Sequence, residues 1–499
     1  MEEQTVSMSE KYILAVDQST QGTKGMIFDA EGKLIARADR PHRQIINDLG
    51  YVEHDPEEIF GNTLAVCGDV IEKAGIPTET IAAMGISNQR ETSVAWNRET
   101  GKPVMNAIVW QCARAAAICE RHQAEAEEIR QKTGMTLSPY FPASKLQWIM
   151  ENVPEAETLG KAGKLCVGTI DAWLIYNLTK DHAFKTDYSN ASRTQLFNIH
   201  TLQWDEELLT SFGIPADAMP EVCMSDSVFG CTDLGGLLPG EIPICGVLGD
   251  SHGALFGQNC RMPGQLKATY GTGSSVMMNI GTEPKLSDGG LVTSLAWGMN
   301  GKVSYVFEGN LNYTGAVITW LKDELGLIQN PGETASLAVK ARKEDRTYFI
   351  PAFTGLGSPY WDPEATGMFT GITRTTGRNE MVKACVECIA YQITDLIGLM
   401  RKETDLSVPV IRVDGGPTAN EYLMQFQSDI ADCEVQIPQL QELSGMGAAY
   451  MAGISAGLYD PETVYDCITY TKYSPDMEET VRTQRLSGWQ DAVRQVLTH

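Results

Sequence analysis

The sequence predicts two closely packed α/β domains with a cleft between them. Near its start, strand-like runs at residues 12–16, 25–29 and 34–38 alternate with tight polar turns, which is typical of an antiparallel meander. A similar set of strands and turns returns about half a chain later, and no Pro- or Ser-rich linker separates the two. With 499 residues, 43% of them hydrophobic, the chain can bury two large cores. We expect the domains to comprise residues 1–253 and 254–499.

In the first half, further strands are expected at residues 81–87, 106–110 and 165–168, and a helix over residues 114–132. The run Asp55-Pro56-Glu57-Glu58 is a typical helix start. Asp accepts hydrogen bonds from the free N–H groups of the first turn, Pro fits that turn, and the acids face the positive end of the helix dipole.

In the second half, an apolar strand at residues 242–249 runs into Asp250 and the start of a helix. A strand at 265–270 enters the turn 271–275, and a strand at 276–279 leaves it. Later, a strand at 411–413 meets Asp414-Gly415-Gly416, and a helix is expected from Asn420 onward.

The charge balance excludes some partners. Against 39 Lys and Arg stand 64 Asp and Glu, a net charge of −25, so neither a nucleic acid nor an anionic membrane surface is expected as partner. No run approaches the ~18 apolar residues that span a bilayer. The first ten residues are polar and acidic, unlike a signal peptide, and the 12 cysteines are scattered. We therefore expect a cytoplasmic protein with reduced thiols.

Two short motifs are interpreted as structural. Cys385 and Cys388 form a Cys-x-x-Cys within a stretch of helical spacing, which favours two buried helix cysteines over a metal or redox site. Ser455 lies in a G-x-S-x-G, but the residues before it read as a helix packed through small side chains and not as the strand that a nucleophile elbow needs.

Two turns predict nucleotide binding. The chain has neither a P-loop nor a G-x-G-x-x-G after a strand. The turns after Val16 and after Tyr270, however, combine Gly with hydroxyl side chains, and backbone N–H groups in such turns can point at one phosphate. The hydroxyl donors are Thr20, Thr23, Thr272 and Ser274, with Lys24 as an added positive charge. Asp17 is suited to hold Mg²⁺ through water. An ordinary pair of hairpins is the alternative.

Asp250 is the candidate base. A carboxylate at the end of a buried strand, at the mouth of a cleft, is placed to take a proton from an alcohol. His252 could serve instead, although a histidine at a helix start is usually structural. Arg90-Glu91 could bind a polyhydroxylated ligand, although such a pair is more often a surface ion pair.

The chain resembles the FGGY carbohydrate kinases, and within them the members that phosphorylate glycerol. The matching stretches follow the family order over essentially the whole chain. They are 17–20 (DQST), 50–56 (GYVEHDP), 88–92 (NQRET), 106–112 (NAIVWQC), 186–193 (TDYSNASR), 270–273 (YGTG), 351–363 (PAFTGLGSPYWDP), 412–416 (RVDGG) and 423–430 (LMQFQSDI).

This resemblance implies two ribonuclease-H-like domains of the actin/hexokinase type, closing on ATP and a small polyol. The implied reaction is Mg²⁺- and ATP-dependent phosphorylation, glycerol to sn-glycerol 3-phosphate, with Asp250 as general base and Asp17 and Asp250 on the magnesium side. The implied polyol contacts are Arg90, Glu91, Trp110, Tyr140, Asp250, Ser251 and Ser275. The implied ATP contacts are Thr20, Gln21, Lys24, Thr272, Gly315, Thr319, Gly416 and Asn420. The family also implies a homodimer or homotetramer.

Departures from the family leave alternatives open. Ser251 stands where glycerol-phosphorylating members carry Gln, and Ser275 where they carry Phe, so a longer polyol or a ketose such as a tetritol, ribulose or xylulose is the rival substrate. The loop between Phe229 and Pro243 lacks the Arg and His linked to family regulation, and neither control is expected. A non-catalytic nucleotide-binding relative is a further alternative, which the presence of Asp17 and Asp250 opposes.

Overall fold

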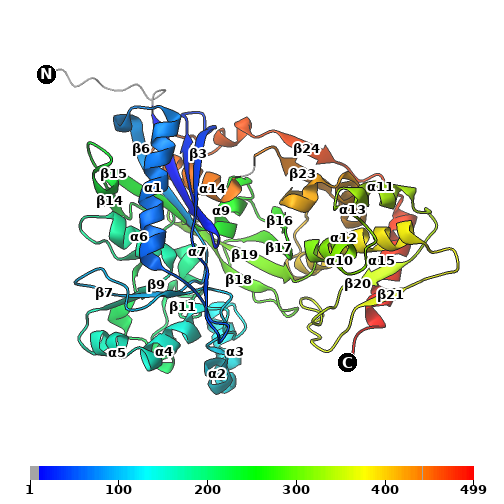
Figure 1. Ribbon diagram of the computed structural model, residues 1–499, viewed down its shortest axis with the longest axis horizontal. Coiled ribbons are helices and arrows are strands. Elements are labelled where there is room, and N and C mark those ends of the chain that lie inside the picture. The colour runs from blue at the N-terminus through cyan, green and yellow to red at the C-terminus, as the bar shows by residue number, and fades with distance from the viewer. Residues whose placement is uncertain (1–10, 441, 499) are drawn as a thin grey trace.

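Each half of the chain contains one large mixed β-sheet, and the two sheets share a similar core of strands (Figure 1). The computed structural model describes residues 11–440 and 442–498, so the polar residues 1–10 lie outside the described part. In each half the first strand pairs antiparallel with the second, two further strands lie parallel to the first on its other side, and an antiparallel strand forms the edge. The halves differ in that β19 lies between β17 and β18, and in that the edge strand β14 precedes its neighbour β15 whereas β24 follows β23. The predicted pair of α/β halves is confirmed.

The first sheet has the order β14-β15-β6-β1-β2-β3. Its strands are β1 (Tyr12–Gln18), β2 (Gly22–Phe28), β3 (Leu34–Pro41), β6 (Ile81–Asn88), β14 (Gly230–Thr232) and β15 (Ile242–Gly249). The second sheet has the order β18-β19-β17-β16-β22-β23-β24. Its strands are β16 (Leu266–Tyr270), β17 (Ser274–Gly281), β18 (Val292–Met299), β19 (Lys302–Leu311), β22 (Val410–Asp414), β23 (Glu434–Pro438) and β24 (Tyr470–Tyr473).

Short strands form smaller sheets beside these two. They are β4 (Ile45–Ile46), β5 (Val52–His54) and β8 (Ala107–Ile108) in one sheet, and the pairs β7 (Val94–Asn97) with β9 (Leu165–Gly168), β10 (Lys185–Asp187) with β13 (Glu221–Cys223), β11 (Phe197–Asn198) with β12 (Gln203–Trp204), and β20 (Tyr348–Ile350) with β21 (Met368–Thr370).

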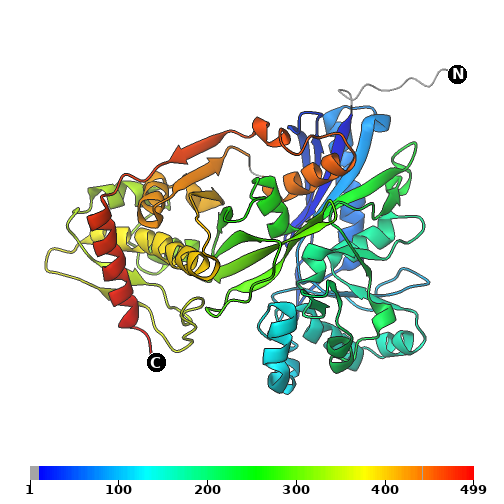
Figure 2. The same cartoon turned by 180° about the vertical axis from the view of Figure 1, so that it is seen from behind.

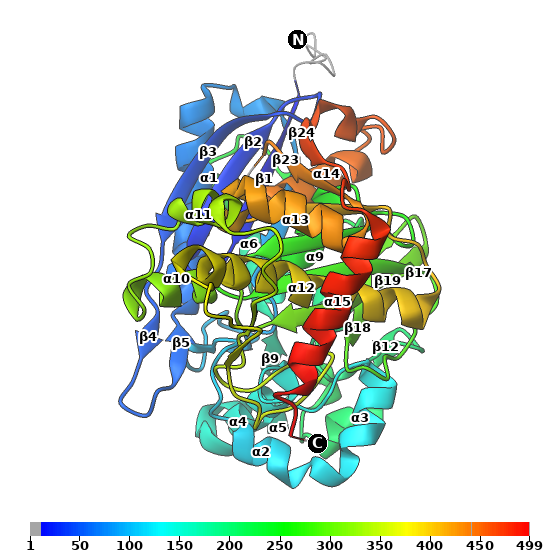
Figure 3. The same ribbon diagram turned by 90° about the vertical axis from the view of Figure 1, so that its right-hand side faces the viewer.

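Helices surround the sheets. In the first half they are α1 (Pro56–Ala74), α2 (Ala116–Arg121), α3 (Ala126–Thr133), α4 (Pro142–Asn152), α5 (Pro154–Lys161), α6 (Ile170–Leu178), α7 (Tyr188–Ala191), α8 (Glu206–Ser211) and α9 (Asp250–Gly257). In the second half they are α10 (Gly315–Asp323), α11 (Glu333–Lys340), α12 (Arg378–Thr404), α13 (Glu421–Ala431), α14 (Leu443–Ser455) and α15 (Glu479–Arg494), the last of which crosses the outer face of its half (Figure 3).

Helix α14 returns from the second half to pack on the first sheet, beside the N-terminal strands (Figure 2). Glycines permit this close approach. A Cβ on Gly85 of β6 would lie 2.4 Å from the Ala448 carbonyl oxygen, and one on Gly246 of β15 would lie 2.4 Å from the Ala452 nitrogen. Ser455 is the last residue of α14, which agrees with a helix-packing role for its motif.

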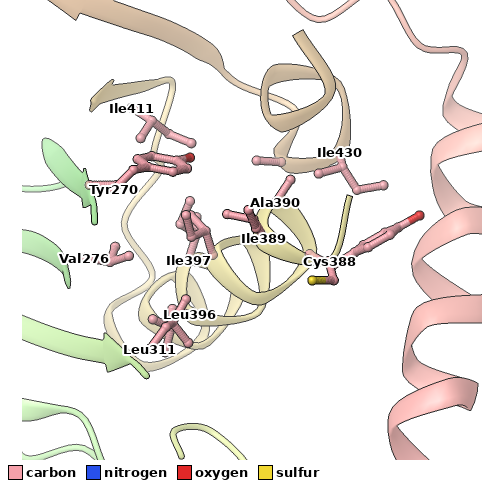
Figure 4. Packing of buried hydrophobic residues seen from close by; sticks show 14 of the residues in the cluster. Tyr270, Val276, Leu311, Cys388, Ile389, Ala390, Leu396, Ile397, Ile411 and Ile430 are labelled. Atoms are coloured by element: carbon pink, nitrogen blue, oxygen red, sulfur yellow. The ribbon is translucent and has the colours of Figure 1, made fainter. Parts of the chain in front are cut away.

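Helix α12 is the centre of the second core (Figure 4). Cys385 and Cys388 are fully buried there among apolar side chains, as predicted. Within residues 11–440 and 442–498 no group of three His, Cys, Asp or Glu side chains is arranged to hold a metal. In the same ranges no helix is both long enough and apolar enough to span a membrane.

Most local predictions are confirmed, and two are wrong in extent. The meander, the Asp55 cap on α1 and the strands that enter Asp250 and the 271–275 turn form as expected. The expected helix over 114–132 is broken at His122, whose backbone leaves helical geometry, into α2, a short 3-10 turn and α3. The expected strand at 106–110 is limited to the two residues of β8, because only that part finds a partner strand.

Candidate active site

Asp17 lies near the end of β1, where parallel β1 and β6 come side by side. Its side chain is buried, and Oδ1 accepts a hydrogen bond of 2.9 Å from the Ser87 hydroxyl. The pKa of Asp17 is raised to about 6, mainly by burial and to a lesser extent by the nearby charge of Asp250, while Lys24 and the Ser87 hydrogen bond oppose the rise. The carboxylate is therefore poorly compensated by the protein, as suits a group that meets a cation.

Lys24 is less available to phosphate than the sequence suggests. Its Nζ lies 2.8 Å from Glu442 Oε2 and 3.7 Å from Asp17 Oδ2. Although burial acts to lower the pKa of Lys24, the charges of Asp17 and Glu442 raise it. Glu442, which precedes α14, was not foreseen as a partner, because it lies 418 residues away in the chain. Glu442 is also paired with Arg37, so the carboxylates of Asp17 and Glu442 are balanced by the two cations Lys24 and Arg37.

The first turn, after Gln18, is held by its own hydrogen bonds. The Ser19 amide and hydroxyl both donate to the Gly22 carbonyl, at 2.8 and 3.0 Å. The Thr20 hydroxyl accepts from Trp110 Nε1 at 3.0 Å, which joins the turn to one of the predicted polyol residues. Gln21 at the tip is exposed. The Thr23 hydroxyl is buried.

Asp250 begins α9 directly after β15. Its Oδ1 accepts from its neighbour's amide, Ser251 N, at 2.6 Å and lies 3.3 Å from Arg90 Nε. The carboxylate is 35% exposed, so it can meet a ligand from the solvent side. His252, two residues further along α9, is fully buried, and burial lowers its pKa well below the usual range. A histidine held neutral and buried is structural, as expected, and Asp250 remains the candidate base.

Arg90 and Glu91 do not form the surface ion pair that such neighbours usually make. Both are buried, and Arg90 donates from its two terminal nitrogens to the two oxygens of Glu308, at 3.0 Å each. Glu91 instead accepts from Arg193 Nε at 2.6 Å. The backbone of Glu91 has a φ of 60°, in the left-handed region that non-glycine residues rarely occupy. Such strain concentrates at functional sites.

Glu308 and Arg193 are site residues without an assigned role at the sequence level. Glu308 on β19 contacts both Arg90 and Arg193, the latter at 2.9 Å. Burial works against its charge, but the two guanidinium groups hold the pKa of Glu308 well below its usual range. One signal in the sequence pointed to Glu308: it is an acid within the largely apolar strand run of residues 303–311. A carboxylate is rarely buried without a cation, so such a position predicts a buried basic partner.

Trp110 and Tyr140 form an aromatic wall beside this network, with ring centroids 5.4 Å apart. Burial raises the pKa of the Tyr140 phenol, and the Glu91 carboxylate raises it further. Ser275 completes the ring of predicted polyol residues, since its hydroxyl lies 3.3 Å from Glu308 Oε1. The structure therefore joins Arg90, Glu91, Trp110, Tyr140, Asp250, Ser251 and Ser275 through direct contacts or shared partners.

The second turn lies against the start of α10. The Gly315 amide donates to the Gly271 carbonyl at 2.9 Å, and a Cβ on Gly315 would lie 2.4 Å from that oxygen. The Ser274 hydroxyl pairs with the Thr314 hydroxyl at 2.8 Å. The Thr272 side chain is exposed.

An adjoining cavity of about 320 Å³ contains the remaining predicted nucleotide residues. Gly315, Thr319, Gly416 and Asn420 line it, together with apolar side chains such as Ile318 and Ile389. Asn420 caps α13, and its Nδ2 donates to Thr334 Oγ1 at 3.0 Å. A concave, mostly apolar site with a few polar groups suits a nucleoside.

The chain is similar to known carbohydrate kinases along its whole length. Models of the FGGY family of carbohydrate kinases match residues 12–257 with its N-terminal domain and residues 266–456 with its C-terminal domain. Glycerol kinase 1 of Thermotoga maritima is 46% identical over 98% of this chain and 100% of its own length. A Vibrio cholerae glycerol kinase is 44% identical over 97% of each chain.

Solved structures agree with this. Plasmodium falciparum glycerol kinase with ADP superposes with a TM-score of 0.93 and 33% identity, covering 98% of this chain and 99% of its own. Ligand-bound xylulose kinase of Lactobacillus acidophilus has a TM-score of 0.86 at 24% identity, covering 97% and 98%, and shares the fold. The two-domain kinase fold expected from the resemblance is confirmed.

Proposed function

This chain belongs to the FGGY family of carbohydrate kinases, and we propose that it transfers the γ-phosphoryl group of ATP to a terminal hydroxyl of glycerol, giving sn-glycerol 3-phosphate and ADP. Relatives that are 44–46% identical over nearly the full length, all named glycerol kinases, favour glycerol over a longer polyol or a ketose. The observation that carries the proposal is the group formed by Asp250, Arg90 and Glu91 beside the Trp110–Tyr140 wall.

Asp250 acts as general base. Its half-exposed carboxylate takes the proton of the attacking hydroxyl, the hydroxyl oxygen bonds to the γ-phosphorus, and the bond from that phosphorus to ADP breaks. Arg90 Nε, 3.3 Å from Oδ1, orients the carboxylate. Arg90 and Glu91 offer hydrogen-bond donors and an acceptor to the polyol hydroxyls, and the aromatic wall covers its carbons.

ATP spans the two turns. The cavity at Gly416 and Asn420 accepts the adenosine, and Gly315 and Thr319 lie on the way from it to the second turn. The turn amides, Thr20, Gln21 and Thr272 face the phosphates. The Asp17 carboxylate, whose nearest cation Lys24 lies 3.7 Å away, fits a magnesium ion held through water, because Mg²⁺ binds one or two carboxylates together with substrate phosphates. Bound there, the ion would neutralise phosphate charge.

Further properties are part of the proposal. We place the division between domains at residues 253 and 254, within α9, the helix that follows the last strand of the first sheet. All twelve cysteines are free, which supports a reducing, cytoplasmic location. The homodimer or homotetramer stays a prediction of the resemblance.

The test is steady-state phosphorylation by the purified full-length protein with MgATP and a panel of glycerol, tetritols and ketopentoses. We expect the highest kcat/KM with glycerol. A kcat/KM for glycerol at least about 100-fold below that for another panel member would contradict the glycerol assignment while leaving the kinase activity in place. No turnover with any member would favour the non-catalytic alternative.

A further inference from the structure

Lys145 is a buried lysine directly behind the polyol side of the site. It lies on the first turn of α4, and its side chain has no exposed area. Its Nζ donates to the carbonyl oxygens of Pro139 and, at 2.6 Å, of Tyr140. Both acceptors belong to the two residues that lead to Phe141, so one ammonium group fixes the backbone on which the Tyr140 ring stands.

Two physical effects oppose an ammonium group at this place. Burial favours its neutral form and lowers the pKa of Lys145 to about 7. Its position near the start of α4 also puts a cation at the positive end of the helix dipole. A methionine would fill a similar volume at neither cost, because replacing a buried charge by a well-packed apolar group is often neutral or stabilising. Packing needs therefore do not account for a lysine here.

The surroundings of Lys145 indicate what it does. Glu91 is the carboxylate whose charge stabilises the ammonium group, and the same carboxylate acts on the phenol of Tyr140. The remaining charged or titratable groups around Lys145 are Arg114, Cys112 and Cys119. Lys145 thus connects, by hydrogen bonds and by charge, two of the side chains that would bind the polyol.

We propose that Lys145 is a positioning residue for the acceptor polyol, fixing the Pro139–Tyr140 backbone and the Glu91 carboxylate in the geometry that polyol binding needs. The inference rests on the proposed function, in which Tyr140 and Glu91 contact glycerol. Since Lys145 contacts neither turn nor the adenosine cavity, its loss should affect the polyol and leave the nucleotide unaffected.

The test measures KM for glycerol, KM for MgATP and kcat in Lys145→Met and Lys145→Gln. In Lys145→Met we expect the glycerol KM to rise about tenfold or more, with KM for MgATP within about twofold and kcat within about threefold of wild type. Lys145→Gln keeps an N–H donor without the charge, so its glycerol KM should lie between that of the wild type and that of Lys145→Met. A purely structural role would change both KM values together or neither.

Lys383 provides the matched control. It is a buried lysine on α12 whose Nζ donates to the Arg342 carbonyl at 3.4 Å and lies 3.9 Å from Glu387. Lys383→Met removes the same buried charge from the other half of the molecule, and the glycerol KM should not change. A glycerol KM within twofold of wild type in folded Lys145→Met would overturn the inference.

A measurement on the wild type covers the case in which neither variant folds. Because the ammonium group loses its proton near pH 7, the glycerol KM should rise severalfold between pH 6.5 and 8.5, and the KM for MgATP should not. Cys112→Ser tests whether the neighbouring thiol causes that rise, since it should leave the profile unchanged. A flat glycerol KM would then overturn the inference. Failure of the proposed function is distinct, because the wild type would then not phosphorylate glycerol at all.

Discussion

Around Asp250 the site consists of charged side chains bonded to one another, whereas around Gly416 none of the described residues that line the cavity is charged. On the polyol side Arg90, Glu91, Arg193 and Glu308 are each nine-tenths or more buried and each has an ionic partner. On the nucleotide side, Gly, Pro, Ile and Ala form most of the wall, with Thr and Asn as the polar groups.

The two sides of the site would obtain specificity in different ways. A polyol presents hydroxyl groups at fixed angles, and buried charged donors and acceptors that cannot rotate discriminate between such arrangements. An adenine ring presents a flat apolar surface, for which shape is sufficient. Substrate binding on the ionic side, around Asp250, should therefore be sensitive to the loss of a single charge. Nucleotide binding on the apolar side, around Gly416, should be sensitive to a change in a single contact distance.

Asp250→Asn should have the largest effect. Removal of the general base should lower kcat by about 10²–10⁴-fold. The nucleotide side is separate, so the Kd for ATP, measured by titration calorimetry, should stay within about twofold. A variant that retains more than a tenth of the wild-type kcat would show that the base lies elsewhere.

Glu308→Gln should disrupt the ionic contacts around Asp250. It leaves the Arg90 and Arg193 guanidinium groups buried without their shared carboxylate, which costs about 3–5 kcal/mol of unfolding free energy. We expect urea unfolding to show this loss, and kinetics to show a glycerol KM raised at least tenfold.

The matched control is Glu387→Gln on α12, where a buried carboxylate pairs with Arg485 at 3.3 Å. It should lose stability without a change in the glycerol KM. Equal effects of both variants on that KM would mean that the polyol site responds to stability in general and not to its own ionic contacts.

Gly315→Ala should disturb the packing of the second turn beside the apolar cavity. The new Cβ would lie 2.4 Å from the Gly271 carbonyl oxygen, so the second turn must move away from α10. We expect the KM for MgATP to rise about tenfold while the glycerol KM stays within twofold. Gly398→Ala, at an open position within α12, is the control and should slightly stabilise the protein. An unchanged KM for MgATP would show that this turn does not position the phosphates.

Asp171→Asn should have the smallest effect, a change in how the free energy of unfolding varies with pH. Burial, and then the charge of Asp187, raises the pKa of Asp171 from 3.8 to about 6. Its stabilising contribution is thus fully present below pH 3.8 and is lost as pH rises through 6. Between pH 5 and 8 the unfolding free energy of the wild type should fall by about 1–2 kcal/mol from this group, and that of the Asn variant should not.

Asp395 on α12, whose pKa burial raises to about 6, allows the same comparison in the nucleotide half. Urea unfolding of Asp171→Asn and Asp395→Asn across this pH range should show gains of similar size. Similar gains in unfolding free energy would show that buried carboxylates behave alike in both halves, so that the contrast between ionic and apolar surroundings is confined to the site. A stability difference from wild type that does not vary with pH would contradict both raised pKa values.

Local rules made much of the fold predictable. The meander, the Asp55 cap and the strand that delivers Asp250 follow from alternation, capping and apolar runs within ten or so residues. The break at His122 and the short β8 were not predictable in this way, because each depends on whether distant backbone supplies a partner. The predicted site residues came partly from such patterns and partly from family resemblance.

Near-neighbour patterns predict where the two turns fall and which carboxylate follows a buried strand, because each of these depends on a few adjacent residues. How the charged side chains are paired follows only from the folded arrangement. Arg90 meets Glu308 across 218 residues, Lys24 meets Glu442 across 418, and Lys145 is buried behind Tyr140. The energy of a buried charge depends on its burial and on the nearest opposite charge, and both are set by which distant segments fold together.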